Sequence, residues 1–233
     1  SLRSLDQSSK LKNVLYEIRG KALVEADRLE AEGYTILKLN TGNPAVFGFD
    51  SPYQIVHDMI EAMPHAHGYS DSRGIMSARR AVVSRYEEVP GFPKFDPDDV
   101  YLGNGVSELI DMTLRALLNP GDEVLVPSPD YPLWSAATIL NDGRPVYYRC
   151  APENGFLPDP VEVEGLVSSR TRAIVLINPN NPTGTMTPLA DIQWLADNKP
   201  KDAILLVDEA YIHWYDGPNA ASRLAARLRA CCP

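Results

Sequence analysis

The chain has 233 residues, 44% of them hydrophobic and 23% charged, a composition typical of one large soluble globular domain or of one and a half ordinary ones. The formal net charge of −9 argues against non-specific binding of nucleic acid, and no apolar run approaches the roughly 20 residues of a membrane-spanning helix. The first ten residues are too polar for a signal peptide. Cys150, Cys231 and Cys232 form neither a disulfide framework nor a metal-binding spacing, so we expect a cytoplasmic protein without a metal site.

The amino-terminal hundred residues predict helices joined by polar loops. Apolar residues at steps of three and four, and breaks at glycine and proline, mark the elements. In chain order they predict a helix over 8–32 that Gly20 interrupts, a strand over 35–39, and helices over 52–63 and 75–88. Two loops rich in glycine and polar residues, 40–44 and 65–74, separate these elements.

From residue 100 onward, short apolar runs alternate with helical patterns on short connections. The runs predict five strands, over 100–102, 123–126, 145–149, 173–177 and 203–207. Helices are expected to end near 118 and 140 and to span about 160–167 and 188–198. This alternation predicts an α/β fold, in which a mostly parallel sheet lies between two helical layers as a three-layer sandwich. The helix over 8–32 precedes it as an amino-terminal arm.

The most distinctive stretch is 174–184, where a buried strand ends in Asn178-Pro-Asn-Asn181-Pro-Thr-Gly184. Proline lacks an N–H group and cannot continue the sheet, so a rigid, amide-rich loop stands at the carboxyl end of the strand. Ligands of open α/β sheets bind at that edge. The same residues are also typical of a plain turn.

Three further loops follow predicted strands, and each offers a different group. Gly103-Asn-Gly105-Val106-Ser107 opens a helix, where free N–H groups and the helix dipole favour an anion such as phosphate, although a simple helix cap has the same pattern. Tyr131 follows Pro129-Asp130 and either stacks on a flat ring or lies at an interface. Asp208 ends an apolar strand, where a carboxylate needs a cation or donor, or caps a helix.

Together the loops suit a planar, phosphorylated, heteroaromatic cofactor with a protonated ring nitrogen. Pyridoxal 5′-phosphate has these properties, because a carboxylate that pairs with its pyridine N–H makes the ring an electron sink.

Six segments carry a resemblance to a known family: LNTGNP, GYSDSRG, GNGVSE, PSPDYP, NPNNPTG and VDEAY, in this order. Over roughly residues 10–215 the chain resembles the class I/II aminotransferases of the fold-type I pyridoxal phosphate family, and within it the alanine and aspartate aminotransferase-like members. The resemblance implies an amino acid and a 2-oxo acid as substrates and a homodimer. The charge and the lack of a long apolar run lead us to expect no nucleic-acid and no membrane partner. It also implies two domains: an amino-terminal arm with a small-domain segment over 1–48, and an incomplete pyridoxal phosphate-binding large domain over 49–233.

The resemblance assigns a role to each motif residue. The residues that would bind the cofactor phosphate are Gly105, Val106 and Ser107, and Tyr69 would reach the phosphate of the neighbouring subunit. For the ring they are Tyr131 by stacking, Asp208 at the pyridine N–H, and Asn181 and Tyr211 at the 3-oxygen. For the substrate carboxylate they are Gly42, through its backbone N–H, and Asn181.

Several family features are missing from this chain: the Schiff-base lysine, the later phosphate-binding arginine, the last strands of the large domain, and the C-terminal small domain with its carboxylate-binding arginine. The Schiff-base lysine of the family follows the motif Asp by about thirty residues, whereas this chain has no lysine after Lys201 and ends 25 residues past Asp208. Lys199 and Lys201 precede the last strand and are expected to be solvated. An Ala/Arg-rich tail over 216–233 reads as a helix. We therefore interpret the chain as the amino-terminal part of an aminotransferase and expect the isolated chain to be inactive.

Three alternatives share this cofactor site. A lyase or racemase of the same fold would differ in its products. A cofactor-sensing module would be non-enzymatic, and a pseudo-enzyme would bind the cofactor weakly or not at all.

Overall fold

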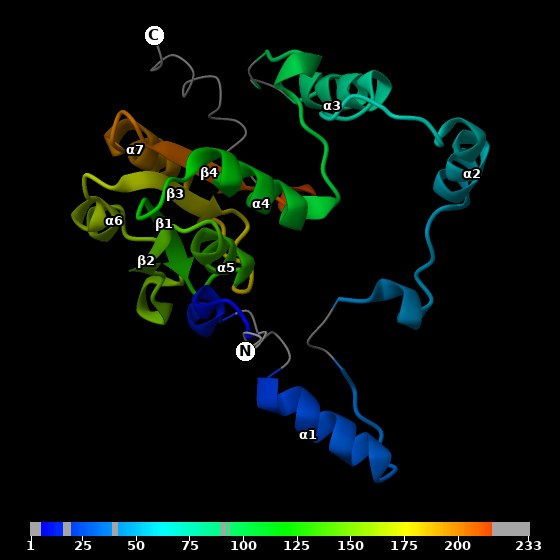
Figure 1. Ribbon diagram of the computed structural model, residues 1–233, viewed down its shortest axis with the longest axis horizontal. Coiled ribbons are helices and arrows are strands. Elements are labelled where there is room, and N and C mark those ends of the chain that lie inside the picture. Colours follow the sequence, from blue (N-terminus) through cyan, green and yellow to red (C-terminus); the bar gives the residue numbers. More distant parts are fainter. Residues whose placement is uncertain (1–5, 16–19, 39–41, 90–91, 93, 216–233) are drawn as a thin grey trace, which may run out of the picture. The chain divides into compact units, whose positions relative to one another are not determined.

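A computed structural model describes residues 6–15, 20–38, 42–89, 92 and 94–215 (Figure 1). The chain forms two compact units, residues 17–72 and residues 1–16 with 73–233, and each is described by itself. The tail over 216–233, with its expected helix and Cys231 and Cys232, lies outside the described residues. The predicted family domains, 1–48 and 49–233, stay a prediction.

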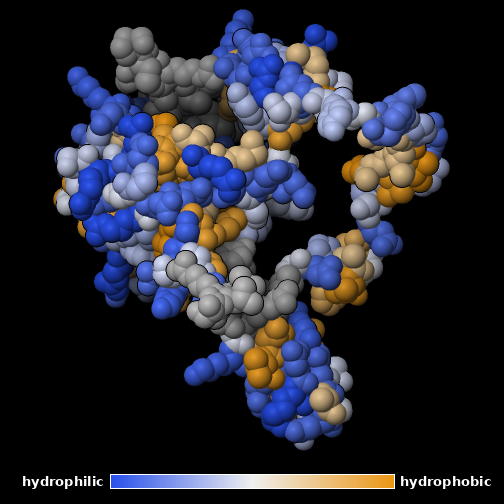
Figure 2. Space-filling view, in the orientation of Figure 1, coloured by the Kyte–Doolittle hydropathy of each residue, from blue (hydrophilic) through white to orange (hydrophobic). Residues whose placement is uncertain are grey.

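The unit of residues 17–72 contains short helices with no buried side chain. They are α1 (Gly20–Ala31), η2 (Pro44–Phe47), α2 (Tyr53–Ala62) and η3 (Met63–His65). On α2 the apolar side chains of Ile55, Met59 and Ile60 are exposed, and Figure 2 shows hydrophobic surface on this helix. Within its described residues this unit therefore has no hydrophobic core of its own.

Two predictions for the amino-terminal part were wrong. The expected helix over 8–32 is divided into η1 (Ser9–Asn13) and α1, which begins at Gly20 with a left-handed φ of +42° that is incompatible with a continuous α-helix. The expected strand over 35–39 is not formed at its described residues, 35–38, which belong to no sheet. Apolar character alone does not make a strand where no partner strand lies alongside.

The larger unit is built on a parallel sheet, as predicted. Its strands are β1 (Glu123–Ser128), β2 (Arg144–Arg149), β3 (Thr171–Ile177) and β4 (Ile204–Asp208). Their order is β2-β1-β3-β4, and every pairing is parallel. The predicted fifth strand, over 100–102, is absent from this four-stranded sheet, because the Leu102 N–H donates to the Arg73 carbonyl at 2.9 Å instead of to a neighbouring strand.

Helices cover both faces of the sheet, which confirms the three-layer architecture (Figure 1). On one face, Val124 and Val126 pack with side chains from α4 (Gly105–Leu117) and α5 (Leu133–Leu140). On the other face, Leu125 packs with side chains from α6 (Pro160–Leu166) and α7 (Leu189–Asn198). The alternation along β1 follows from the two-residue period of a strand. A further helix, α3 (Met76–Glu87), precedes α4.

The strand order places a crevice at one edge of the sheet. The chain goes from β1 outward to β2, and then crosses to the other side of β1 to form β3. The connections that leave β1 and β3 at their carboxyl ends therefore diverge to opposite sides. In open α/β sheets this switch in direction is where ligands bind, and the loops that begin at 129 and 178 leave the sheet there.

At the opposite edge, the first residue of β1 is a buried carboxylate. Glu123 has a side-chain exposure of 1%. Its Oε2 accepts a hydrogen bond from the Ser168 hydroxyl at 2.7 Å, and its Oε1 accepts from Arg170 Nε at 3.0 Å and from Arg144. The Ser168 hydroxyl first, and then the two guanidinium groups, lower the pKa of Glu123 to about 2. This cluster holds the loops before β1, β2 and β3 together.

Replacing Glu123 by Gln should destabilise the fold at pH 7 by roughly 2 kcal/mol, a value reduced for the solvent screening of the two arginines. Because the folded pKa of about 2 lies below the ordinary value of 4.5, the contribution is fully present above about pH 5 and is lost as the pH falls toward 2. Urea unfolding of both proteins between pH 3 and pH 7 measures this difference. Glu164→Gln, at an exposed position on α6, is the control, and a Glu123→Gln effect that does not shrink at low pH would contradict the account.

Candidate cofactor site

The carboxyl ends of β3 and β4 are tied together by the backbone. The N–H of Asn178, directly after β3, donates to the carbonyl of Asp208, the last residue of β4, at 2.8 Å. The predicted amide-rich loop therefore starts beside Asp208, the predicted carboxylate residue, at the carboxyl edge of the sheet.

The three asparagines of the loop have different surroundings. Asn178 is fully buried, and its Oδ1 accepts from the Thr187 N–H at 2.8 Å. Asn180 is also buried, and its Oδ1 accepts from the Thr183 hydroxyl at 2.9 Å. Asn181 is half-buried and lines a pocket. Asn178 and Asn180 thus shape the loop through their side-chain oxygens, and Asn180 and Asn181 both line the pocket. The role of Asn181 at the ring 3-oxygen stays a prediction.

That pocket has a volume of about 360 Å³ and brings two predicted residues together. Asn181 lines it from the loop after β3, and Tyr211 lines it from the segment after β4. Trp214 and Tyr215 add aromatic surface to the same pocket. Neither residue belongs to a predicted site motif, although their position close behind Asp208 was a usable signal.

The predicted phosphate loop and the predicted ring tyrosine are also neighbours. Helix α4 begins at Gly105, whose φ of +75° lies in the left-handed region that favours glycine. Val106 and Ser107 occupy its first turn, where N–H groups have no acceptor within the helix. The Ser107 hydroxyl lies 3.4 Å from the hydroxyl of Tyr131. An anion bound at this helix terminus would therefore lie beside the tyrosine ring.

Asp208 is held by two uncharged donors. Its carboxylate, in a residue only 7% exposed, accepts from the Trp134 indole N–H at Oδ2 at 3.0 Å and from the Ala210 N–H at Oδ1 at 3.1 Å. The second bond is a local contact two residues along the chain, and the first is a tertiary contact. Asp208 does not cap a helix, because the next helical turn, η6 (Ile212–Trp214), has Tyr211 at its N-cap. Each carboxylate oxygen has two lone pairs, so Asp208 can accept one more donor.

Trp134 was missed by the sequence analysis. It lies in the first turn of α5, three residues after Tyr131, and is itself 5% exposed. A buried tryptophan needs an acceptor for its N–H, and a carboxylate at the tip of a buried strand needs a donor. The sequence does not show that these two residues pair with each other, because they are 74 positions apart.

Asp130, in the segment between β1 and α5, is a second carboxyl at this edge of the sheet, and it is partly buried. Burial raises the pKa of Asp130, and a hydrogen bond from the Ser135 side chain opposes this shift. Its Oδ2 is buried and has no hydrogen-bond partner among the described residues.

The remaining predicted site residues, Gly42 and Tyr69, lie in the unit of residues 17–72. Both are exposed in that unit. Their roles at the substrate carboxylate and at the phosphate of a neighbouring subunit stay predictions.

Two lysines of the larger unit stand near β4, but at its start. Lys199 and Lys201 precede Ile204, whereas Asp208 ends the strand, so they lie at the opposite edge of the sheet. Lys201 is exposed as expected; Lys199 is half-buried, and its Nζ donates to the Pro200 carbonyl at 3.5 Å. Neither reaches the pocket edge.

Among the described residues, no helix is long and apolar enough to cross a membrane. The same part of the chain contains no cluster of three or more His, Cys, Asp or Glu side chains that could bind a metal ion.

The residues at this edge fit pyridoxal phosphate. A helix terminus with Ser107 suits the phosphate, and the Tyr131 hydroxyl lies beside it. Asp208 has a free lone pair for the pyridine N–H, and Asn181 and Tyr211 share a pocket. The family model for "Aminotransferase class I and II" matches residues 34–231. The chain belongs to this family.

Relatives within the family point to a narrower group. Over 210 residues the chain is 59% identical to an alanine aminotransferase of Mycobacterium tuberculosis, covering 90% of this chain and 49% of that protein. It is 49% identical to the glutamate-pyruvate aminotransferase AlaA of Escherichia coli, covering 89% of this chain and 51% of that protein. The chain thus spans about half the length of the curated relatives it matches.

Solved structures agree with the fold. A crystal structure of an aminotransferase from Escherichia coli superposes with a TM-score of 0.87 at 44% identity, covering 96% of this chain and 56% of that one. A Thermus thermophilus aspartate aminotransferase variant superposes with a TM-score of 0.86 at 26% identity, covering 97% and 58%. Both confirm the predicted aminotransferase fold.

Replacing Trp134 by Phe should destabilise the chain by about 2 kcal/mol, because it leaves a buried carboxylate oxygen of Asp208 without its donor. Urea unfolding measures the change. The same substitution in an Asp208→Ala background is the control: there the packing loss persists, but no hydrogen bond remains to be lost, so the cost should fall by at least about 1 kcal/mol. If Trp134→Phe lowers the free energy of unfolding equally in both backgrounds, the hydrogen bond contributes nothing to stability.

Proposed function

We propose that this chain binds pyridoxal 5′-phosphate at the carboxyl edge of its sheet and supplies the cofactor site of an alanine-type aminotransferase. The observation that carries the proposal is the buried Asp208 carboxylate. Two neutral donors hold this carboxylate, the Trp134 indole and the Ala210 N–H. Trp134 lies three residues after Tyr131, and Tyr211 lies three residues after Asp208. When bound there, the cofactor supplies an electron sink for the reacting amino group.

Most of the proposed cofactor contacts would come from the larger unit. The first-turn N–H groups of α4 and the Ser107 hydroxyl would bind the phosphate, with the helix dipole adding attraction. Tyr131 would lie against the ring. Asp208 would accept the pyridine N–H and so keep the ring nitrogen protonated. Asn181 and Tyr211 would donate to the 3-oxygen from their shared pocket.

The substrates follow from the relatives. Their printed names, alanine aminotransferase and glutamate-pyruvate aminotransferase, favour an exchange between alanine and a 2-oxo acid in the whole protein. Asn181, and Gly42 through its backbone N–H, would bind the substrate carboxylate. The same relatives favour transamination over the lyase, racemase, sensor and pseudo-enzyme alternatives.

In the whole protein a second copy would complete the site. Tyr69 would reach the phosphate in the neighbouring subunit of a homodimer, and a cytoplasmic setting would keep the buried Cys150 thiol reduced. A lysine for covalent attachment of the cofactor is not present after Lys201 in this chain.

Ser107→Ala should weaken the binding of pyridoxamine 5′-phosphate about tenfold, because one hydrogen bond to a charged group is lost. Binding of pyridoxamine, which lacks the phosphate, should stay unchanged. Isothermal titration of both ligands measures the two affinities, and neither ligand has an aldehyde that would react with lysines. Ser169→Ala, at the opposite edge before β3, is the control; an equal loss for both ligands would place the phosphate elsewhere.

The purified 233-residue chain should bind the cofactor but show no alanine transamination with 2-oxoglutarate. No lysine follows Lys201, which itself lies at the wrong edge of the sheet, so the base that moves the substrate proton is missing. A coupled assay for pyruvate measures turnover. Sustained pyruvate formation would overturn this expectation.

A further inference from the structure

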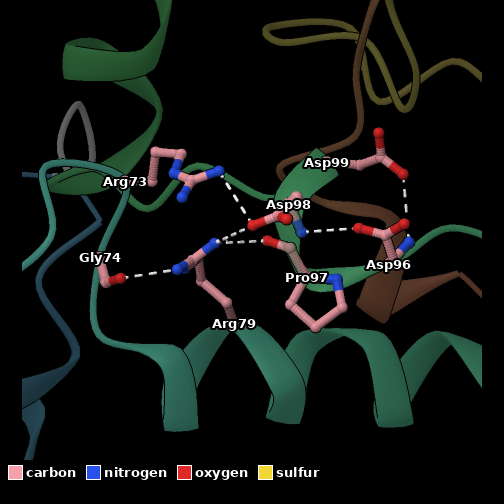
Figure 3. Close-up of polar contacts among 7 residues, drawn as sticks. All are labelled: Arg73, Gly74, Arg79, Asp96, Pro97, Asp98 and Asp99. Atoms are coloured by element: carbon pink, nitrogen blue, oxygen red, sulfur yellow. Dashed lines mark hydrogen bonds and ion pairs between the residues drawn. The ribbon is translucent and has the colours of Figure 1, made fainter.

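A buried arginine outside the predicted site joins two backbone segments of the larger unit. Arg79, on α3, is 1% exposed. Its Nε donates to the Gly74 carbonyl at 3.0 Å, and one terminal nitrogen donates to the Pro97 carbonyl at 2.8 Å (Figure 3). One planar guanidinium thus binds a carbonyl that precedes α3 and a carbonyl that follows it.

Asp98 reinforces this contact from the solvent side. Its Oδ1 accepts from Arg79 at 3.2 Å and from Arg73 at 2.9 Å (Figure 3). The turn that carries it is itself fixed, because the Asp98 N–H donates to the Asp96 carboxylate at 2.8 Å and the Asp96 N–H donates to the Asp99 carboxylate at 3.1 Å. The cluster therefore locks residues 73–74 against residues 96–99.

The locked segment leads directly to the phosphate loop. The carbonyl of Arg73 accepts from the Leu102 N–H at 2.9 Å. Gly74 has a φ of +104°, and a Cβ there would lie 2.6 Å from the Leu102 side chain, so only glycine allows this close packing. Leu102 directly precedes Gly103-Asn104-Gly105, where α4 begins. Residues 73–74 thus set the position from which the chain enters the first turn of α4.

We propose that Arg79 is a positioning residue for the phosphate loop, and that its loss selectively weakens binding of a phosphate monoester. Arg79 acts through two backbone segments: it fixes residues 73–74, which hold Leu102, which places the N–H groups at Gly105–Ser107. The proposal rests on the proposed cofactor site, and it adds a determinant of phosphate affinity that touches neither the ligand nor the loop.

The planar geometry of the guanidinium distinguishes this role from that of a buried charge. Arg79→Lys keeps the charge, but a single ammonium cannot span the carbonyls of Gly74 and Pro97 as the guanidinium does. Arg79→Met keeps the stem and loses the charge. Arg80→Met, at the next, exposed position of the same helix, is the matched control. Asp98→Asn, at a side chain 71% exposed, is a mild variant that tests the cluster without emptying a buried site.

Two readouts on the 233-residue chain test the proposal. Amide hydrogen exchange should become about tenfold faster over 102–107 in Arg79→Met and Arg79→Lys, and several-fold faster in Asp98→Asn, with β1 and β3 unchanged. The dissociation constant for pyridoxamine 5′-phosphate should rise about tenfold in the Arg79 variants, whereas that for pyridoxamine should change less than twofold. Arg80→Met should change neither.

Several results would overturn the proposal: unchanged exchange over 102–107, an equal loss for both ligands, or full rescue by Arg79→Lys. If Arg79→Met does not fold, Asp98→Asn and Arg79→Lys decide through the same two readouts. A wild-type chain that fails to bind pyridoxamine 5′-phosphate would instead refute the cofactor site, and exchange over 102–107 would then still decide whether Arg79 holds the loop.

Discussion

The hydrogen bond from the Trp134 indole to the Asp208 carboxylate joins the parts of the molecule on which the candidate site depends. It connects the helix after β1 with the last residue of β4, across β3 in the order of the sheet. The Asn178 N–H, which donates to the Asp208 carbonyl, connects β3 to the same residue. Tyr131 and Asn181 therefore belong to segments that both bond to Asp208, the first through its carboxylate and the second through its backbone carbonyl.

Two buried carboxylates in one sheet show how differently the two edges are built. Glu123, at the amino end of β1, is surrounded by a hydroxyl and two guanidinium groups, which lower its pKa to about 2. Asp208, at the carboxyl end of β4, accepts from an indole and a backbone amide, both neutral. A buried carboxylate that is already paired with cations gains little from another, whereas one held by neutral donors gains from a cationic N–H. Only the Asp208 edge is suited to a protonated ring nitrogen, and it is also the edge where the chain direction switches.

Local patterns predicted the parts of the fold that depend on neighbours in sequence. The alternation of short apolar runs with helical patterns predicted the parallel sheet and its two helical layers, and the proline-rich end of β3 predicted the edge that carries Asn181 and Asp208. Sequence patterns gave wrong or no predictions where a residue's structure depends on a partner elsewhere in the chain. Residues 100–102 have strand-like composition, but the Leu102 N–H pairs with Arg73. Trp134 bonds to a residue 74 positions away, and Arg79 bonds to backbone on both sides of its own helix; composition gives no sign of either contact.

The central claim is that Asp208 keeps the cofactor ring nitrogen protonated. The most direct test is a ¹⁵N NMR titration of pyridoxamine 5′-phosphate, labelled at the ring nitrogen and bound to the chain. The account predicts that the pyridinium signal of the bound ligand persists at pH values where the free ligand has lost that proton, and that Asp208→Ala abolishes the difference. A bound ligand that titrates like the free one, or a shift that survives in Asp208→Ala, would contradict it.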